Sequence, residues 1–343
     1  MIRRHQVTIK EVAARAGVSV KTVSRVINNE YGVKEETAAN VKQACLELGY
    51  RADLSARSLR RADRRTQSIG LVISSVANEF DSVVHSAIEA VANEHDVMVL
   101  AVSSEDIVTR EKDYVQRLMQ RQIDGLIIAS TGPDQEWLRG VAATIPVVFI
   151  DRIPTPLLGD AVVSENYAGA KAAINHLIDH GHRRIGFAGD LSVIQTAQDR
   201  LRGYRDALRE HGLETVDSYC LDSVRDLVKF RSQLTTLIHG DSPVTAVFAA
   251  RNNLAAETMR FLQAENLNDK IAVIGFDDID YADLFCTPLT VVAQDVARMG
   301  TLAARRLFAR IDGRLDSAPE LIEIPVTIIA RGSGEVRPAD PTP

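Results

Sequence analysis

The sequence predicts a small all-α head followed by a larger, two-lobed α/β body built on parallel sheets. The first observation behind this is length, because 343 residues are enough for two or three domains at roughly 100–200 residues each. The second is charge: residues 1–65 hold 14 Lys and Arg against 7 Asp and Glu (net +7), which leaves 26 against 39 (net −13) for the remainder. The third is apolar spacing, which is helical near the N-terminus and alternates between strand and helix patterns after residue 67.

Composition excludes several classes of protein. Apolar residues make up 45% of the chain and charged residues 25%, which is typical of a globular protein and excludes wholesale disorder. No run approaches the roughly 18 uncharged apolar residues of a membrane span, and the N-terminus has no apolar stretch typical of a signal peptide. Cys45, Cys220 and Cys286 are too few and too scattered for a disulfide framework or a metal site. We therefore expect a reduced, cytoplasmic protein without membrane contact.

Two short helices joined by a tight turn begin the head. Thr8 can cap the first helix, and Gly17 tolerates the positive φ at which that helix must end. Ser19 can cap a second helix that runs to about Asn28. Apolar residues recur at helical spacing along both, at Ile9, Val12, Ala13, Ala16, Val23, Val26 and Ile27. A third helix over about 35–48 completes a small core, so the pattern is typical of a helix-turn-helix.

The outer face of the second helix carries Val20, Lys21 and Arg25. Lys21 and Arg25 are four residues apart and are therefore neighbours on a helix surface. In helix-turn-helix proteins the start of the second helix enters the major groove of DNA, where Arg can bind guanine O6 and N7. The basic head is thus a candidate for DNA binding. An ordinary helical hairpin with solvated charges would show the same local pattern.

Longer stretches of the sequence favour the DNA-binding interpretation over an ordinary helical hairpin. The stretches TIKEVAARAGVSVKTVSRVIN (Thr8–Asn28) and ELGYRADLSARSLR (Glu47–Arg60), followed by VVSENYAGA, HGHRRIGFAGD, RLRGY and IAVIGFDDID, resemble the lactose/galactose repressor (LacI/GalR) family in order and spacing. The resemblance covers nearly the whole chain. It implies a bacterial transcription regulator with a helix-turn-helix domain over 1–50, a hinge helix and linker over 51–66, and an effector-binding and dimerisation body over 67–332. That body would be similar to periplasmic binding proteins.

The resemblance also implies which residues contact DNA. Residues of the second helix would read base edges or lie near phosphates, and residues of the hinge helix would enter the minor groove at the operator centre. The implied DNA-binding residues are Thr8, Ser19, Val20, Lys21, Thr22, Arg25, Asn28, Ala56, Arg57 and Leu59. Leu59 would be a wedge that levers apart the central base step, at an unstacking cost of a few kcal/mol. One wedge per subunit implies a homodimer on a pseudo-palindromic, double-stranded operator.

Two positions in the head depart from the family's pattern. Asp53 replaces the usual Asn at the start of the hinge helix, where Asp is also a good cap. Lys34 replaces the usual Ser cap of the third helix. We expect the second change to lower stability without affecting base reading.

After Gln67 short apolar runs alternate with helical stretches. The runs are Ile69–Ile73, Val97–Val102, Gly125–Ala129, Val147–Ile150, Ile185–Ala188, Ala246–Ala250 and Ala272–Phe276. Such alternation is typical of parallel α/β sheets, and its recurrence before and after about Val163 predicts two similar lobes. The chain is expected to cross between the lobes near residues 163, 292 and 324.

Ligands of open α/β sheets bind beyond the carboxyl ends of the strands. That rule singles out polar residues after the apolar runs, at 75–80, 151–152, 252–253 and 277. The family resemblance implies the same places and adds residues near 200. The implied effector-binding residues are Asn78, Phe80, Asp81, Asp151, Arg152, Thr196, Arg200, Asn252 and Asp277. Asp, Asn and Arg side chains suit vicinal hydroxyls and one carboxylate, so we expect a sugar or sugar acid as the effector.

Three positions near this cleft depart from the family's pattern. Asp81 stands where an aromatic residue is usual, which removes a stacking surface and adds an acceptor for hydroxyls or for a cationic ligand group. Asn253 replaces an Asp, and Ser223 stands about where an aromatic wall is often found. Arg152 and Asn253 are explained equally well as loop caps.

No catalytic or cofactor site can be assigned from the sequence. His176, His180 and His182 form H-x3-H-x-H, but no Glu follows the first, and we interpret them as residues of a helix C-terminus rather than metal ligands. The acidic stretch 277–280 lacks the Gly and terminal Glu of a calcium loop, and phosphate loops and G-x-S-x-G elbows are absent. We therefore expect no cofactor, no metal and no enzyme activity.

The last residues, 333–343, are rich in Gly and Pro, and we expect a disordered tail. They lack the leucine heptads with which some family members form tetramers, which favours a dimer.

The function that fits best is a sequence-specific transcription regulator, most often a repressor in this family, whose cleft binds a small metabolite. Activation remains open, as does the choice between induction and co-repression. One alternative is a cytoplasmic solute-binding or sensing protein with a vestigial head, although such a head need not keep Lys21, Arg25 and Leu59 together. A second alternative is an enzyme acting on a sugar or nucleoside, which would need a placed acid, base or nucleophile.

Overall fold

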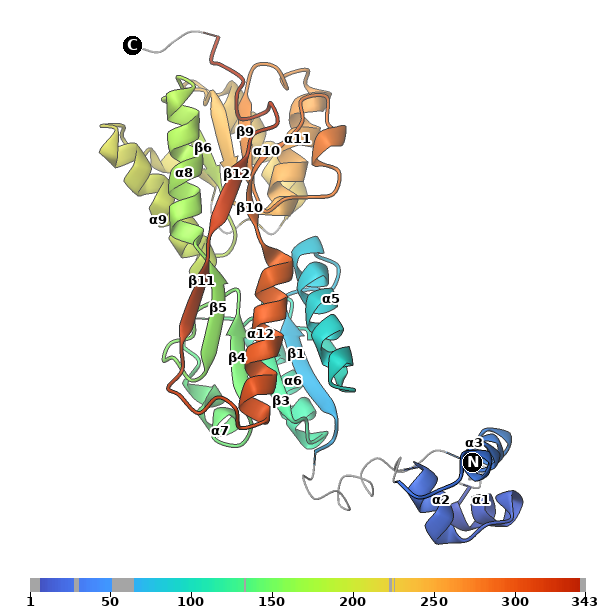
Figure 1. Cartoon of the computed structure of the whole chain (residues 1–343). Coiled ribbons are helices and arrows are strands. Elements are labelled where there is room, and N and C mark those ends of the chain that lie inside the picture. Colours follow the sequence, from blue (N-terminus) through green and yellow to red (C-terminus); the bar gives the residue numbers. More distant parts are fainter. Residues whose placement is uncertain are drawn as a thin grey trace. The chain divides into compact units, whose positions relative to one another are not determined.

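The computed structural model describes residues 7–27, 31–50, 65–132, 134–221, 224 and 226–339. The chain forms two compact units, Met1–Thr66 and Gln67–Pro343, which are described separately (Figure 1). No helix within the described ranges is long and apolar enough to cross a membrane.

The N-terminal unit contains three helices, α1 (Ile9–Ala16), α2 (Val20–Ile27) and α3 (Glu35–Leu48). Thr8 and Glu11 cap α1 reciprocally: the Glu11 amide donates to Thr8 Oγ1 over 3.4 Å, and the Thr8 amide donates to Glu11 Oε2 over 2.7 Å. Gly17 ends α1 with a φ of 67°. Lys34 precedes α3 without a side-chain capping bond, as its residue type predicts. The three helices share a core of Val12, Ala13, Ala16, Val23, Val26, Val41 and Ala44.

The larger unit contains two six-stranded sheets, one in each lobe (Figure 1). The strands of the first lobe are β1 (Ser68–Ile73), β2 (Met98–Ser103), β3 (Gly125–Ile128), β4 (Val147–Ile150), β5 (Asp160–Ser164) and β11 (Leu321–Ile324), in the order β11-β5-β4-β3-β1-β2. Those of the second lobe are β6 (Ile185–Ala188), β7 (Cys220–Leu221), β8 (Ala246–Ala249), β9 (Ala272–Phe276), β10 (Thr290–Gln294) and β12 (Val326–Ile329), in the order β12-β10-β9-β8-β6-β7. All strand pairs are parallel except β10 with β12. The two lobes therefore repeat one strand order and differ in the direction of the last strand.

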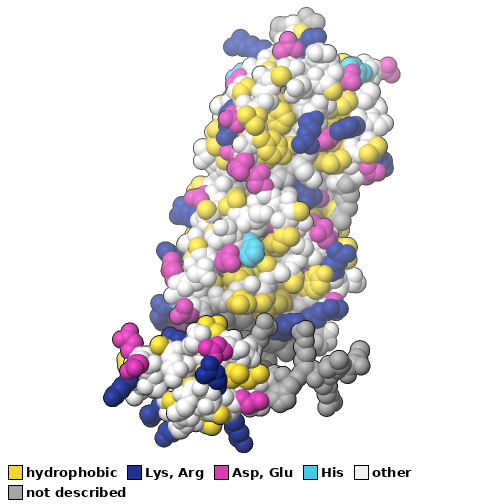
Figure 2. Space-filling view, turned by 90° about the vertical axis from the view of Figure 1, so that its right-hand side faces the viewer, with side chains coloured by type: hydrophobic (Ala, Val, Ile, Leu, Met, Phe, Trp, Pro, Cys, Tyr) yellow, Lys and Arg dark blue, Asp and Glu magenta, His cyan; other side chains and the backbone are white. Residues whose placement is uncertain are grey.

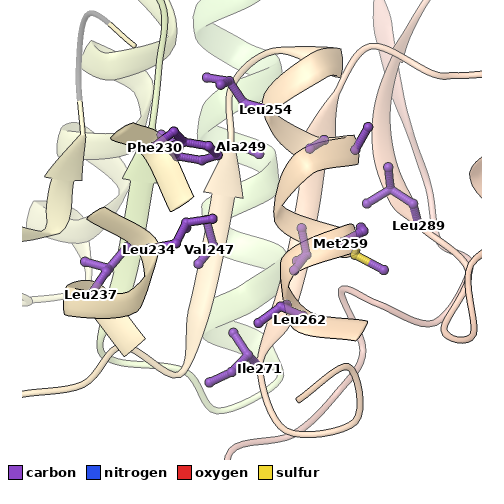
Figure 3. Packing of buried hydrophobic residues seen from close by; sticks show 14 of the residues in the cluster. Phe230, Leu234, Leu237, Val247, Ala249, Leu254, Met259, Leu262, Ile271 and Leu289 are labelled. Carbon is purple, nitrogen blue, oxygen red and sulfur yellow. The ribbon is translucent and has the colours of Figure 1, made fainter. Parts of the chain in front are cut away.

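Helices cover the sheets of both lobes. The first lobe has α5 (Glu79–Glu94), α6 (Val108–Gln120), α7 (Arg139–Ala142), α12 (Val296–Ile311) and the short 3-10 turn η1 (Glu136–Leu138). The second has α8 (Asn166–Asp179), α9 (Gln195–Glu210), α10 (Leu227–His239), α11 (Asn252–Ala264) and the 3-10 turns η2 (Asp217–Tyr219) and η3 (Ala282–Leu284). In the second lobe α10 and α11 pack buried side chains such as Leu234 and Leu262 against β8 (Figure 3). This core holds the carboxyl ends of the strands in fixed positions.

The chain crosses between the lobes at three places. It leaves the first sheet after β5 to enter α8, which packs on β10 and β12 of the second sheet. It returns after β10 to enter α12, which packs on β3, β4 and β5. It crosses again between β11 and β12. Each lobe is consequently built from separate stretches of sequence.

The expectation of a disordered tail over 333–343 is wrong for residues 333–339. Ser333 is buried and its Oγ donates to the carbonyl of Val273 over 2.6 Å. Glu335 pairs with His176 over 2.5 Å, and the His182 ring contacts the carbonyl of Val336 over 2.7 Å. Gly and Pro content alone could not reveal these partners, which lie elsewhere in the sequence; residues 340–343 lie outside the described part of the chain.

Candidate functional site

The second helix of the head presents a polar outer surface. Val20 and Lys21 are exposed on α2, whereas Val23 is buried in the core. Ser19 Oγ accepts a hydrogen bond from the Thr22 amide over 3.1 Å, which places hydroxyl groups at the start of α2. Arg25 is partly exposed in the last turn of the helix. Thr8 is exposed at the start of α1. The remaining expected DNA contacts, Asn28, Ala56, Arg57 and Leu59, and the hinge residue Asp53 lie outside the described residues.

The nine residues expected to bind an effector all line one cavity between the lobes. Three of them begin α5 and two follow β4 in the first lobe; two lie on α9, one begins α11 and one follows β9 in the second. The lining residues that the sequence analysis did not include are Ser74, Ala129, Asp190, Ile194, Arg251 and Gln294. The free volume is about 60 Å³. The carboxyl ends of the two sheets thus meet around a narrow polar space.

Asp151 and Asp277 occupy equivalent positions in the two lobes. Each follows a strand and has a left-handed backbone, with a φ of 66° at Asp151 and 74° at Asp277. Each amide donates over 3.0 Å to the neighbouring strand, to the carbonyl of Val162 in one lobe and of Val292 in the other. Left-handed backbone is uncommon outside glycine and concentrates at functional sites. Here it turns one carboxylate from each lobe towards the cavity.

Arg200 is held in place from several sides. Its Nε donates to Asn166 Oδ1 and its Nη1 to the carbonyl of Ala250, both over 2.8 Å. The guanidinium lies over the ring of Phe276 at 3.7 Å from its centroid, and Nη1 is 3.9 Å from Asp277 Oδ2. A cation stacked and hydrogen-bonded in this way is suited to positioning a ligand.

Arg152 organises the wall of the first lobe. Its Nη2 donates to Asp106 Oδ1 over 2.8 Å, its Nη1 donates to the carbonyl of Ser130 over 3.2 Å, and its Nε lies 3.4 Å from Asp151 Oδ2. Burial alone would lower the pKa of Arg152, but the two carboxylates raise it. Burial would likewise raise the pKa of Asp106, but Arg152 brings it below its usual value. Arg152 therefore caps a loop and also lines the cavity.

Asp81 is a buried acid in the same wall, with 5% of its surface exposed. Its Oδ2 accepts a hydrogen bond from the Ser75 amide over 2.8 Å. Burial, together with a smaller contribution from the neighbouring Asp151, raises the pKa of Asp81 to about 7. Burial raises the pKa of Asp151 as well. The first-lobe wall therefore holds two acids whose charged forms are unfavourable.

Three sets of hydrogen bonds join the lobes beside the cavity. Asn78 Nδ2 donates to Asn252 Oδ1 over 3.2 Å, and Asn252 Nδ2 donates back to Asn78 Oδ1 over 3.1 Å. The Asp280 amide donates to Glu79 Oε1 over 2.9 Å. The Ile153 amide donates to Gln195 Oε1 over 3.1 Å. Asn78 and Asn252, which we expected to bind the effector, thus bind each other across the cleft.

Sequence reasoning missed two charged residues that line the cavity, Asp190 and Arg251, and one beside it, Asp106, which binds Arg152. Asp106 follows the run Val97–Val102, and Asp190 follows the run Ile185–Ala188. The rule of strand ends, applied to these two runs, would have found both. Arg251, which immediately precedes Asn252, pairs with Asp190 over 2.7 Å.

The three histidines of the H-x3-H-x-H pattern have structural partners. His176 pairs with Glu335, the His180 ring contacts the carbonyl of His176 over 2.8 Å, and the fully buried His182 contacts Thr245 Oγ1 over 2.9 Å. Within the described residues, no group of three His, Cys, Asp or Glu side chains could hold a metal ion.

Comparisons with known proteins find matches to both units of the chain. A family model described as "Bacterial regulatory proteins, lacI family" matches residues 8–53, and one described as "Periplasmic binding protein-like domain" matches residues 174–334. The chain is 32% identical to the probable transcriptional regulator EndR of Paenibacillus polymyxa, over 92% of this chain and 94% of that one. It is 32% identical to the regulator GalS of Salmonella typhimurium, over 90% and 92%. It also resembles the crystal structure of the Lac repressor dimer bound to operator and an anti-inducer, with a TM-score of 0.79, 25% identity and coverage of 96% and 99%.

Proposed function

Since this chain belongs to the LacI family of bacterial transcriptional regulators, we propose that it represses transcription by binding a pseudo-palindromic operator as a dimer, under the control of a metabolite bound in the cleft. A regulator of this kind acts on the chromosome, so its proposed location is the nucleoid. No catalytic role is proposed.

The head supports the DNA-binding part of the proposal. Residues 1–65 carry a net charge of +7, which suits a polyanion. In the proposed complex the start of α2 enters the major groove, where Val20, Lys21 and Arg25 read base edges. Ser19 and Thr22 contact phosphates at the helix N-terminus. The hinge residues Ala56, Arg57 and Leu59 would read the minor groove, with Asn28 on the backbone.

Exposed apolar side chains on the larger unit support the dimer. Met98 in the first lobe is 66% exposed, and Val228 and Leu284 in the second are 80% and 81% exposed. Figure 2 shows hydrophobic side chains on both lobes of one face. Apolar side chains that gather on one face, as in Figure 2, are typical of interaction surfaces. The Lac repressor in the similar structure is a dimer on its operator, and the same arrangement would pair two heads here.

The convergence of nine side chains from both lobes on one cavity is the observation that carries the effector part of the proposal. The free volume of about 60 Å³ is below the roughly 300–1,000 Å³ of drug-sized ligand pockets. A sugar-sized effector therefore enters only if the lobes move apart or the wall rearranges. Binding is thereby coupled to lobe movement, with a typical coupling of about 1–3 kcal/mol.

The test measures operator binding and effector response separately. An operator is selected from random duplexes, and binding is followed by fluorescence anisotropy. Arg25→Ala should weaken specific binding by about 1–3 kcal/mol, whereas Lys10→Ala, a change of an exposed cation on α1, should have a smaller effect.

Arg200→Ala should abolish the effector response and keep operator binding, while the exposed Arg205→Ala on the same helix should keep both. A protein that prefers no duplex over random competitor, with or without metabolites, contradicts the proposal.

A further inference from the structure

The arginines of the cleft already have carboxylate partners. In the second lobe Arg251 pairs with Asp190 over 2.7 Å, and Arg200 lies 3.9 Å from Asp277. The second lobe therefore contributes two arginines and two carboxylates to the cavity, and their charges cancel. An anionic ligand in this lobe would therefore compete with Asp190 for Arg251 and with Asp277 for Arg200.

The first lobe contributes more negative charge than positive charge. Its one cavity-lining arginine, Arg152, contacts two carboxylates, those of Asp106 and Asp151. Asp81 is the third carboxylate of this wall, and it accepts a hydrogen bond from the backbone amide of Ser75. In the described part of the chain no side chain donates a hydrogen bond to Asp81, although the residue is 5% exposed and lines the cavity. An unpaired buried carboxylate is costly unless a ligand supplies the missing donor.

A second cavity beside the first has the same sign of charge. It has a volume of about 520 Å³ and shares Phe80, Asp277 and Gln294 with the inner cavity. Its acidic lining residues are Glu79, Asp277, Asp278, Asp280, Asp283 and Asp295. Its one arginine, Arg331, is already bound by Asp278 through contacts of 2.6 and 2.7 Å. A space lined by one sign of charge raises the local concentration of ions of the opposite sign.

From these charges we infer that the effector is a cation, an amino sugar or a similar amine-bearing polyol whose ammonium group binds the Asp81 carboxylate. The inference rests on the proposed effector function and narrows the expected class, because it excludes sugar acids. An ammonium would give Asp81 a charge-assisted hydrogen bond. A carboxylate ligand would instead meet Asp81 and Asp151 with like charge, and Arg152 and Arg200 each already have a carboxylate nearby. The remaining hydroxyls would bind Asp277 and Arg200.

The experiment compares ligands that differ in one substituent. Isothermal titration of the full-length protein uses glucosamine, galactosamine, glucose, galactose, glucuronate and galacturonate. We expect at least one amino sugar to bind about tenfold or more tightly than its neutral counterpart, with an affinity that falls as NaCl is raised. The uronates should show no binding.

Asp81→Asn is the decisive variant. The Asn side-chain oxygen can still accept from the Ser75 amide, so the local fold is kept. The preference for amine over hydroxyl should fall to about one in this variant and stay unchanged in Asp179→Asn, which alters an exposed carboxylate at the end of α8. The melting temperature of Asp81→Asn should equal or exceed that of the original protein, because the variant removes a buried charge.

The outcomes separate this inference from the proposed function. If a neutral sugar or a uronate binds more tightly than the amino sugars, or if the operator-binding protein responds to none of them, the amine inference is wrong and the regulator stands. If Asp81→Asn keeps the full preference, the assignment of the ammonium to Asp81 is wrong. If no operator is recognised, the proposed function itself fails.

Discussion

Glu111 is a buried acid of the first lobe that does not line the cleft. It is fully buried on α6; its Oε2 accepts from the Thr131 amide over 2.7 Å, and its Oε1 has no hydrogen-bond partner among the described residues. Burial raises the pKa of Glu111 to about 7, against which the bond from Thr131 acts only in part. Because the folded state binds the proton more tightly than the unfolded state does, Glu111 favours folding below its usual pKa and loses that effect as pH rises towards 7.

Glu111→Gln should therefore change the pH profile of stability. Its amide oxygen can accept from Thr131, and no charge needs to be buried above neutral pH. We expect the free energy of unfolding to rise by about 1–3 kcal/mol relative to the original protein at pH 8, and the gain to shrink towards zero at pH 5. Urea unfolding at both values measures this, with the exposed Glu94→Gln on α5 as control. Parallel pH profiles for the two proteins would contradict the prediction.

At the scale of residues, the sequence predicted side chains that all line one cavity, but it did not predict how they are bonded. The rule of strand ends and the family resemblance pointed to Asp151, Arg200 and Asp277, and all three line one cavity. They could not show that Asp151 and Asp277 have left-handed backbones, because Asp adopts either conformation and tertiary contacts decide. They also could not show that Asn78 bonds Asn252, since the two are 174 positions apart.

Among the elements, two pairs of helices approach each other through a glycine. A Cβ added at Gly203 on α9 would lie 2.5 Å from the backbone oxygen of Tyr167 on α8. A Cβ added at Gly300 on α12 would lie 2.8 Å from the backbone oxygen of Val84 on α5. Backbone atoms cannot move aside as a side chain can, so both contacts depend on the missing Cβ.

Gly203→Ala should force α8 and α9 apart. Overpacking of this kind costs about 1–3 kcal/mol, which we expect as a loss in the free energy of unfolding. Gly140→Ala on α7 is the matched control, because an added Cβ there meets nothing within 4 Å. The control should be neutral or slightly stabilising, since Ala is the better helix former. Equal stability of both variants, measured by chemical denaturation, would show that the contact is not tight.

Strands were predicted reliably from the sequence only where they consist of an uninterrupted run of apolar residues. All seven runs form strands. The sequence analysis treated the segments around 163, 292 and 324 as crossovers, whereas they also contain the strands β5, β10, β11 and β12. β11 and β12 are short, and polar residues such as Glu323 and Thr327 interrupt them. β7, with two residues, is too short to be recognised from its pattern.

For the whole molecule, the relation between the lobes depends on a few polar contacts. The amides of Asn78 and Asn252 bond each other reciprocally, and each single change to Asp leaves one of the two bonds available. The double change places two carboxylates opposite each other. We therefore predict that Asn78→Asp with Asn252→Asp opens the lobes, whereas either single change has a small effect.

Small-angle X-ray scattering without effector measures this opening as a larger radius of gyration of the double variant. The increase should exceed the sum of the two single changes, because the repulsion exists only in the pair. Asn78→Asp also keeps the carboxyl oxygen that can cap α5 in place of Asn78 Oδ1. A double variant as compact as the original protein would show that other contacts, such as that of Glu79 with the Asp280 amide, decide the closure.

The fold class was predicted correctly from strand–helix alternation and family strings, and comparison with known structures confirms it. Strand–helix alternation predicts the layers of the fold, because apolar strands must be covered by helices on both faces of the sheet. It does not report how far two lobes close, since closure rests on hydrogen bonds such as that between the Ile153 amide and Gln195. Those bonds involve ordinary polar residues that have no pattern in the sequence.

The three crossings between the lobes determine how the larger unit can be dissected. A gene fragment for residues 67–164 would encode β1 to β5 without α12 and β11, leaving Ile127 and Val148 without the cover of Leu307 and Phe308. An isolated first lobe would instead require a circularly permuted gene that joins 296–324 to 67–164 in one reading frame. Simple truncation would yield an insoluble fragment rather than half of a binding protein.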